Sequence, residues 1–101
     1  MGMVLRDVAK KLGLGEYEVE VRAARALVLE ELRKVRVEKA QILIKYAKYD
    51  VKGFKDLFRL VEEDILCDTE VHEDLTRLDY LEYREKELEK TLRELEDKLG
   101  G

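Results

Sequence analysis

The segment EEDILCDTEVHED, residues 62–74, holds the densest group of side chains in this sequence that could take part in acid–base or metal chemistry. It has one thiol, Cys67, one imidazole, His72, and seven carboxylates. A zinc site uses four protein ligands, or three and a water, and the chain has no second cysteine or histidine. It also lacks the Glu-x-x-His pairs with which helical bundles hold two irons. We therefore expect no metal, no other cofactor and no catalytic residue.

The same carboxylates suit the binding of a basic protein. Residues 22–48 carry eight basic and three acidic side chains, a sum of +5, whereas residues 49–101 carry nine basic and seventeen acidic ones, a sum of -8. Such an asymmetry can mark one face for a basic partner, although solvated helix faces produce it too. The predicted contacts for that partner are Glu62, Glu63, Asp68, Glu70, Glu73, Tyr80 and Tyr83.

The stretch DVAKKLGLGEYEV, residues 7–19, raises a second possibility, which is DNA binding. Ala9, Gly13 and Val19 have the spacing of the small residue, the turn glycine and the apolar anchor of a helix-turn-helix, so residues 7–25 resemble regulators of that class. Carboxylates at the start of the second helix would repel DNA phosphates, and this makes DNA binding the alternative. The basic side chains that the resemblance would place at phosphates are Arg22 and Arg25.

Apolar residues at helical spacing predict the elements that position these side chains. The chain contains no proline, which favours long helices. EYEVEV alternates with period two, as a strand does, but a lone strand would have no partner, so we assign it to a helix. We expect an all-α helical bundle with a short N-terminal helix and turn (1–15), a long central helix (16–50), a short helix (54–66) and a coiled-coil-like C-terminal helix (70–99), divided by Gly13, Gly15 and Gly53.

The predicted C-terminal helix has a heptad repeat whose apolar seam needs a second helix. From Leu78 onward only Glu85 interrupts that seam. Asp74 also occupies a seam position and needs a partner such as Arg77 or a lysine. The second helix could be the central helix of the same chain or a helix of another chain. The residues expected at this dimer or bundle seam are Val28, Val35, Ile42, Leu78, Leu81, Leu88, Leu92 and Leu95.

Size and composition indicate the number of domains, the cellular compartment and the oligomeric state of the chain. With 101 residues it is expected to form one domain, 1–101. Its single cysteine cannot form an internal disulfide, and no apolar run is long enough for a membrane span, so we expect a cytoplasmic protein. The 44% of charged residues and the absence of asparagine resemble thermophile proteins. Because the helices carry more apolar surface than one small core covers, we also expect a homodimer.

A second resemblance covers residues 42–95. The order KYAKYDVKGFKDLF, an acidic connection, and TEVHEDLTRLDYLEYREKELEKTL is similar to small helical antitoxin components of archaea and bacteria. The residues that carry it are Lys45–Tyr46, Lys48–Tyr49, Phe54, Glu70, Glu73–Asp74 and Tyr80. The resemblance implies a non-enzymatic protein that binds and silences a toxin, often one that cleaves RNA. A DNA-binding regulator and a structural, self-associating bundle subunit are the alternatives.

Overall fold

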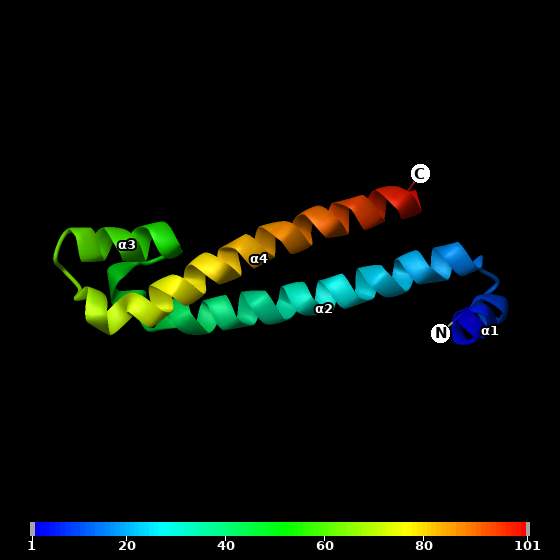
Figure 1. Ribbon diagram of the computed structural model, residues 1–101, viewed down its shortest axis with the longest axis horizontal. Helices are drawn as coiled ribbons and strands as arrows, with labels where there is room; N and C mark the ends of the chain where they lie inside the picture. Colours follow the sequence, from blue (N-terminus) through cyan, green and yellow to red (C-terminus); the bar gives the residue numbers. More distant parts are fainter. Residues whose placement is uncertain (1, 101) are drawn as a thin grey trace. The chain divides into compact units, whose positions relative to one another are not determined.

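The fold of the chain is all-α, as the periodicity predicted (Figure 1). The computed structural model describes residues 2–100, and within them there is no strand. The helices are α1 (Gly2–Leu12), α2 (Glu16–Ile44), the short 3₁₀ helix η1 (Ala47–Tyr49), α3 (Phe54–Glu62) and α4 (Asp68–Gly100). The alternating EYEVEV stretch forms the first turns of α2. No helix in this range is both long and apolar enough to cross a bilayer.

Two helices end in the same backbone motif, in which a residue of left-handed conformation reverses the chain. At the end of α1, Gly13 has φ +70°, and the N–H of Leu14 donates to the carbonyl of Ala9 at 2.9 Å. At the end of α3, Asp64 has φ 57°, and the N–H of Ile65 donates to the carbonyl of Leu60 at 2.9 Å. The sequence pattern predicted the glycine stop, but it extended the short helix to residue 66, past this turn.

The long helix α2 ends at Ile44, several residues before the predicted end at residue 50. The N–H groups of Lys45 and Tyr46 bond to carbonyls three residues back, at 3.1 and 3.0 Å, which tightens the last turn. The chain then passes through η1 and leaves it at Asp50, which has left-handed φ and ψ of 55° and 44°. The apolar pattern continues through this segment because Tyr46 is buried there, and it therefore concealed the end of the helix.

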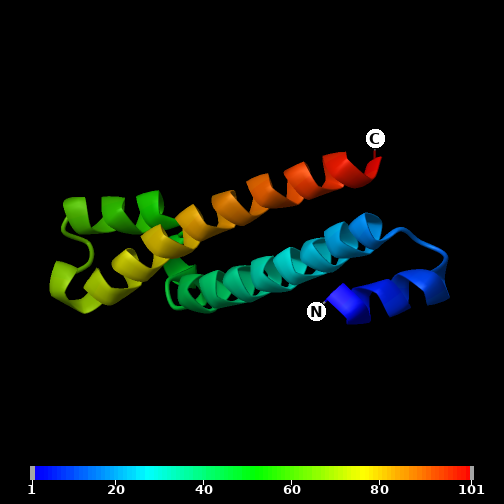
Figure 2. The same cartoon turned by 45° about the vertical axis from the view of Figure 1, so that its right-hand side comes forward.

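The chain divides into two compact units, and both long helices contribute to each. The first unit contains the residues up to Leu32 and those from Leu88 onward. In Figure 2, α1 turns back beside the start of α2. Arg6 of α1 pairs with Glu16 of α2 at 2.7 Å. The buried apolar side chains of this unit are Ala9, Val19, Val21, Leu32 and Leu88.

The second unit, Arg33–Glu87, contains residues 62–74, which we call the acidic segment. Its parts of α2 and α4 run antiparallel, since Arg36 pairs with Glu85 while Lys45 pairs with Asp74. In both views α3 lies alongside the start of α4 (Figures 1 and 2). Leu57 of α3 and Leu78 of α4 are fully buried. The other buried side chains are Val35, Ile42, Tyr46, Val51, Val71, Leu75 and Leu81.

The predicted seam is covered inside a single chain. Val35, Ile42, Leu78, Leu81 and Leu88 are buried, and Val28, Leu92 and Leu95 are half-buried. The sequence left open whether the facing helix belongs to the same chain or to another, and the structure uses α2 and α4 of one chain. Five of the eight seam residues are therefore covered within the chain, and Val28, Leu92 and Leu95 remain partly exposed.

Candidate functional site

The acidic segment lies on the surface of the second unit, where α3 ends and α4 begins. Between Arg59 and Arg77 the sequence has seven carboxylates and no lysine or arginine. None of the six exposed ones forms an ion pair within residues 2–100. They are Glu62, Glu63, Asp64, Asp68, Glu70 and Glu73. The structure thus displays every carboxylate that the sequence assigned to a basic partner.

Helix geometry accounts for some of these charges and not for others. Asp68 and Glu70 lie in the first turn of α4, where carboxylates stabilise the positive end of the helix dipole. Glu62 lies at the opposite, unfavourable end of α3, and Glu63 follows it. A carboxylate at the C-terminal end of a helix lowers stability, so the fold of α3 does not account for the presence of Glu62 and Glu63.

Cys67 lies on the surface between the two helices, which the sequence could not establish. Its Sγ is 3.0 Å from the Thr69 hydroxyl. This hydrogen bond and those from the backbone at the start of α4 lower the pKa of the Cys67 thiol. Within residues 2–100 no three His, Cys, Asp or Glu side chains come together as a metal site would need.

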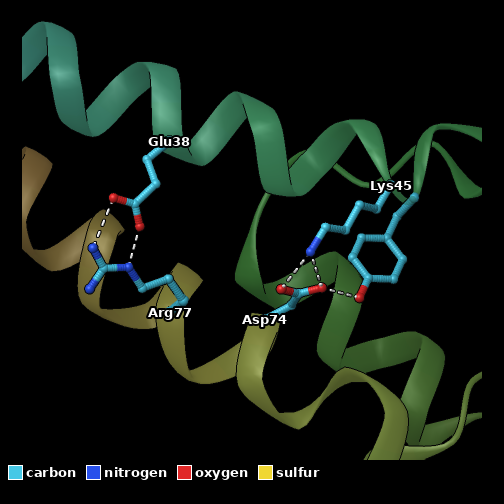
Figure 3. Close-up of polar contacts among 5 residues, drawn as sticks. Glu38, Lys45, Asp74 and Arg77 are labelled. Atoms are coloured by element: carbon cyan, nitrogen blue, oxygen red, sulfur yellow. Dashed lines mark hydrogen bonds and ion pairs between the residues drawn. The ribbon is translucent and has the colours of Figure 1, made fainter.

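Asp74, the seventh carboxylate, is turned inward and fixed to the end of α2 (Figure 3). Lys45 donates to both of its oxygens, at 3.3 and 3.4 Å, and the Tyr46 hydroxyl donates to Oδ2 at 2.5 Å. The lysine partner that the sequence required for Asp74 is therefore Lys45. Burial first, and then the hydrogen bond to Asp74, raise the pKa of Tyr46 strongly. Asp74 therefore links the start of α4 to the segment that follows α2.

Arg77, the first basic residue after the acidic segment, pairs with Glu38 of α2 (Figure 3). The guanidinium of Arg77 also lies 5.0 Å from the ring centroid of Tyr80. Tyr80 is 50% exposed, and it lines an open hollow of ≈ 660 Å³ together with Glu73. Tyr83 is 64% exposed. Both of the tyrosines that the sequence assigned to a partner are therefore exposed.

A groove between α3 and α4 adjoins the acidic segment, and it was not predicted from the sequence. It is an open hollow of ≈ 400 Å³, and its lining includes Phe54, Phe58 and Leu75. The two phenylalanine rings stack with centroids 5.7 Å apart. The side chains that complete the lining are Asp68, His72, Thr76 and Asp79. The i, i+4 spacing of the two rings was the only signal in the sequence, and it indicated one face of an amphipathic helix rather than a groove.

One carboxylate of α4 fixes the start of α3 and hence one wall of this groove. Glu82 Oε2 accepts a hydrogen bond from the backbone N–H of Phe54 at 2.6 Å. The same oxygen lies only 2.7 Å from the position that a Cβ at residue 53 would take. Gly53 therefore serves to admit the Glu82 side chain, as well as to break the helix pattern.

The helix-turn-helix residues have a packing role in the structure. Ala9 and Val19 are buried, and Gly13 makes the turn between α1 and α2. Arg22 pairs with Glu18 at 3.0 Å, and Arg25 pairs with Glu96 at 3.5 Å. Both cations proposed for phosphate contact are therefore already balanced by carboxylates of the chain itself.

The comparisons with known proteins give a family. No curated protein and no solved structure matches the chain. A family model described as "Uncharacterized protein MJ0235 family" matches residues 3–99. Because this match spans nearly the whole sequence, the chain belongs to that family.

Proposed function

We propose that this chain is a non-catalytic binding module, antitoxin-like in its action, that masks a basic partner protein with its acidic segment. The observation that carries the proposal is the group of six exposed carboxylates between Arg59 and Arg77, none paired with a basic side chain in residues 2–100. Other carboxylates of the chain do pair with basic side chains across helices, as in Arg36–Glu85 and Arg25–Glu96. Unpaired charges of one sign attract a partner of the other sign and raise its rate of encounter.

Carboxylates on a rigid helix junction can occupy a cleft built for phosphates, and a nucleic-acid-cleaving enzyme has such a cleft. The partial resemblance of residues 42–95 to antitoxin components supports an RNA-cleaving partner. Tyr80, half-exposed beside Glu73, supplies an aromatic anchor next to the charges. The exposed thiol of Cys67 suits a reducing cytoplasm.

DNA binding is the second candidate, favoured by the buried Ala9 and Val19 on either side of the Gly13 turn. It has less support, because Arg22 and Arg25 are each paired with a carboxylate. Releasing them to phosphates would leave Glu18 and Glu96 unpaired beside the DNA, which adds repulsion.

Two experiments separate the candidates. Co-expression of the tagged chain with the product of the adjoining gene should recover a stable complex if that product is a basic nuclease or nucleotidyltransferase. A gel-shift assay with random duplex DNA at about 150 mM salt should show no shift, because the acidic surface repels phosphates. A robust shift that Arg22→Ala with Arg25→Ala abolishes would instead establish DNA binding and overturn the proposal.

A further inference from the structure

Helix α1 carries an apolar face that nothing in its own unit covers. Val4, Val8 and Leu12 are 67%, 39% and 63% exposed. Their spacing of four residues places them along one face of the helix. Ala9, which is buried, holds α1 to its unit from another side. Single exposed apolar residues are common on protein surfaces, but three in a row on one short helix form a patch that fits a partner.

The charges of α1 are mainly basic. Lys10 and Lys11 lie in its last turn, both exposed, and neither forms an ion pair within residues 2–100. Arg6 is already paired with Glu16. The surface that would complement α1 must therefore combine an apolar floor with carboxylates.

The groove between α3 and α4 has this combination. Phe54 and Phe58 form its apolar wall, and Phe58 is 43% exposed. The charged groups of its lining are the carboxylates of Asp68 and Asp79, and no lysine or arginine belongs to it. Grooves between two helices are a common seat for a third, amphipathic helix.

We propose that α1 of one copy of this chain docks in the α3–α4 groove of a second copy. The apolar face of α1 lies on the phenylalanine pair, and its two lysines lie beside Asp68 and Asp79. The groove matches α1 both in apolar surface and in charge, and we therefore assign α1 of a second copy as its occupant. The contact joins two different surfaces, so it closes into a dimer if the two copies exchange helices and extends into longer assemblies if they do not.

The first test uses two variants, each of which removes one half of the contact. Val8→Asp with Leu12→Asp disables α1 and keeps the groove, whereas Phe58→Asp disables the groove and keeps α1. All three positions are exposed, so the variants should fold, and circular dichroism checks that they do. In sedimentation equilibrium up to hundreds of micromolar, the wild-type chain should exceed its monomer mass of 11.9 kDa. Each variant alone should remain a monomer.

Mixing the two variants gives the decisive result. One intact α1 and one intact groove are then present, so a 1:1 complex should form with an affinity within about tenfold of a single wild-type contact. A symmetric interface between identical surfaces could not be restored in this way. A wild-type chain that stays monomeric, variants that still associate, or a mixture that gives no complex would each overturn the proposal.

A charge exchange and a matched control complete the experiment. Lys10→Glu with Lys11→Glu should weaken association about tenfold or more, and adding Asp68→Lys with Asp79→Lys to the same chain should restore it. Ile44, 75% exposed on α2, provides the control. Ile44→Asp introduces the same chemical change outside the proposed contact and should leave association unchanged. Dissociation by Ile44→Asp would place the interface on α2 and contradict the inference.

Discussion

The Tyr46 hydroxyl donates a hydrogen bond to Asp74 Oδ2 at 2.5 Å, and this joins the end of α2 to the start of α4 beneath the acidic segment. Tyr46 is buried, Asp74 is half-buried, and Lys45 balances the charge of the carboxylate. The bond keeps one of the seven carboxylates inside the fold while the other six face solvent.

Tyr46→Phe should lower the free energy of unfolding by about 1–2 kcal/mol at pH 7, because it removes the shorter of the two hydrogen bonds to Asp74 Oδ2 and leaves only the one from Lys45. The pKa of Tyr46 is raised in the folded state, so the stability linked to its protonation is present below its ordinary pKa, about 10, and is lost as the pH rises above that value. The difference between wild type and Tyr46→Phe in urea unfolding should therefore shrink above about pH 10. A difference that stays constant to pH 11.5 would contradict this linkage.

Gly53→Ala should destabilise the second unit by about 1–2 kcal/mol. The added Cβ displaces the Glu82 carboxylate, a flexible group that can move away but then loses its hydrogen bond to the Phe54 N–H. In a Glu82→Ala background the same glycine substitution should cost almost nothing. Thermal unfolding of the double-mutant cycle measures this coupling, and additive effects would show that the two residues act independently.

Glu85, the single charge in the predicted seam from Leu78 onward, should be stabilising rather than harmful. It is half-buried and bridges Arg36 at 3.1 Å and Lys39 at 3.3 Å. Burial raises the pKa of Glu85, but the hydrogen bonds from Arg36 and Lys39 together outweigh burial and lower it. Its contribution is therefore present above the ordinary pKa of about 4.3 and disappears as the pH falls below it.

Glu85→Leu alone should lower stability at pH 7 by about 1 kcal/mol, since it leaves Lys39 half-buried and unpaired. Adding Lys39→Met should recover most of that loss, because an apolar pair can replace a partly buried ion pair. At pH 3 the single substitution should cost less than at pH 7. Equal cost at both values would mean that the ion pairs contribute nothing.

Asp50→Gly should raise stability by about 0.5–1 kcal/mol, because Asp50 adopts the left-handed conformation that glycine accepts without steric strain. Asp50→Val should lower it by more than about 1 kcal/mol, since a branched side chain fits that conformation poorly. Unfolding in guanidinium of both variants checks the order. If valine were tolerated as well as glycine, the turn after η1 would not depend on this backbone conformation.

The sequence predicted the features that depend on local periodicity. The heptad of Leu78, Leu81 and Leu88 indicated which face of the C-terminal helix is buried, and Gly13 indicated the end of α1. The helix end at Glu62 was missed because an aspartate, Asp64, rather than a glycine takes the left-handed position after it. The end at Ile44 was missed because the buried Tyr46 continues the apolar pattern beyond it.

The groove and its supports depend on contacts between residues far apart in the chain. Glu82 binds a backbone N–H 28 residues away, and nothing in the local pattern indicates this. The exposure of the carboxylates could be predicted, because the apolar residues Val71 and Leu78 define the buried face of α4 and the charged residues between them lie mostly off that face. The sequence indicated that Asp74 is the carboxylate that turns inward. It did not indicate that the Tyr46 hydroxyl would be one of its hydrogen-bond partners.

The most direct test of the proposed function uses calorimetry to measure the affinity of the chain for the product of the adjoining gene, where that product is a basic protein. Glu62→Lys with Glu63→Lys should weaken binding about tenfold or more without loss of stability, because lysines suit the end of α3. The matched control, Glu20→Lys with Glu94→Lys, reverses two exposed carboxylates of the first unit and should leave affinity nearly unchanged. Wild-type binding should also weaken as salt rises. Equal losses in both pairs, or binding that is indifferent to the reversal at Glu62 and Glu63, would contradict capture by the acidic segment.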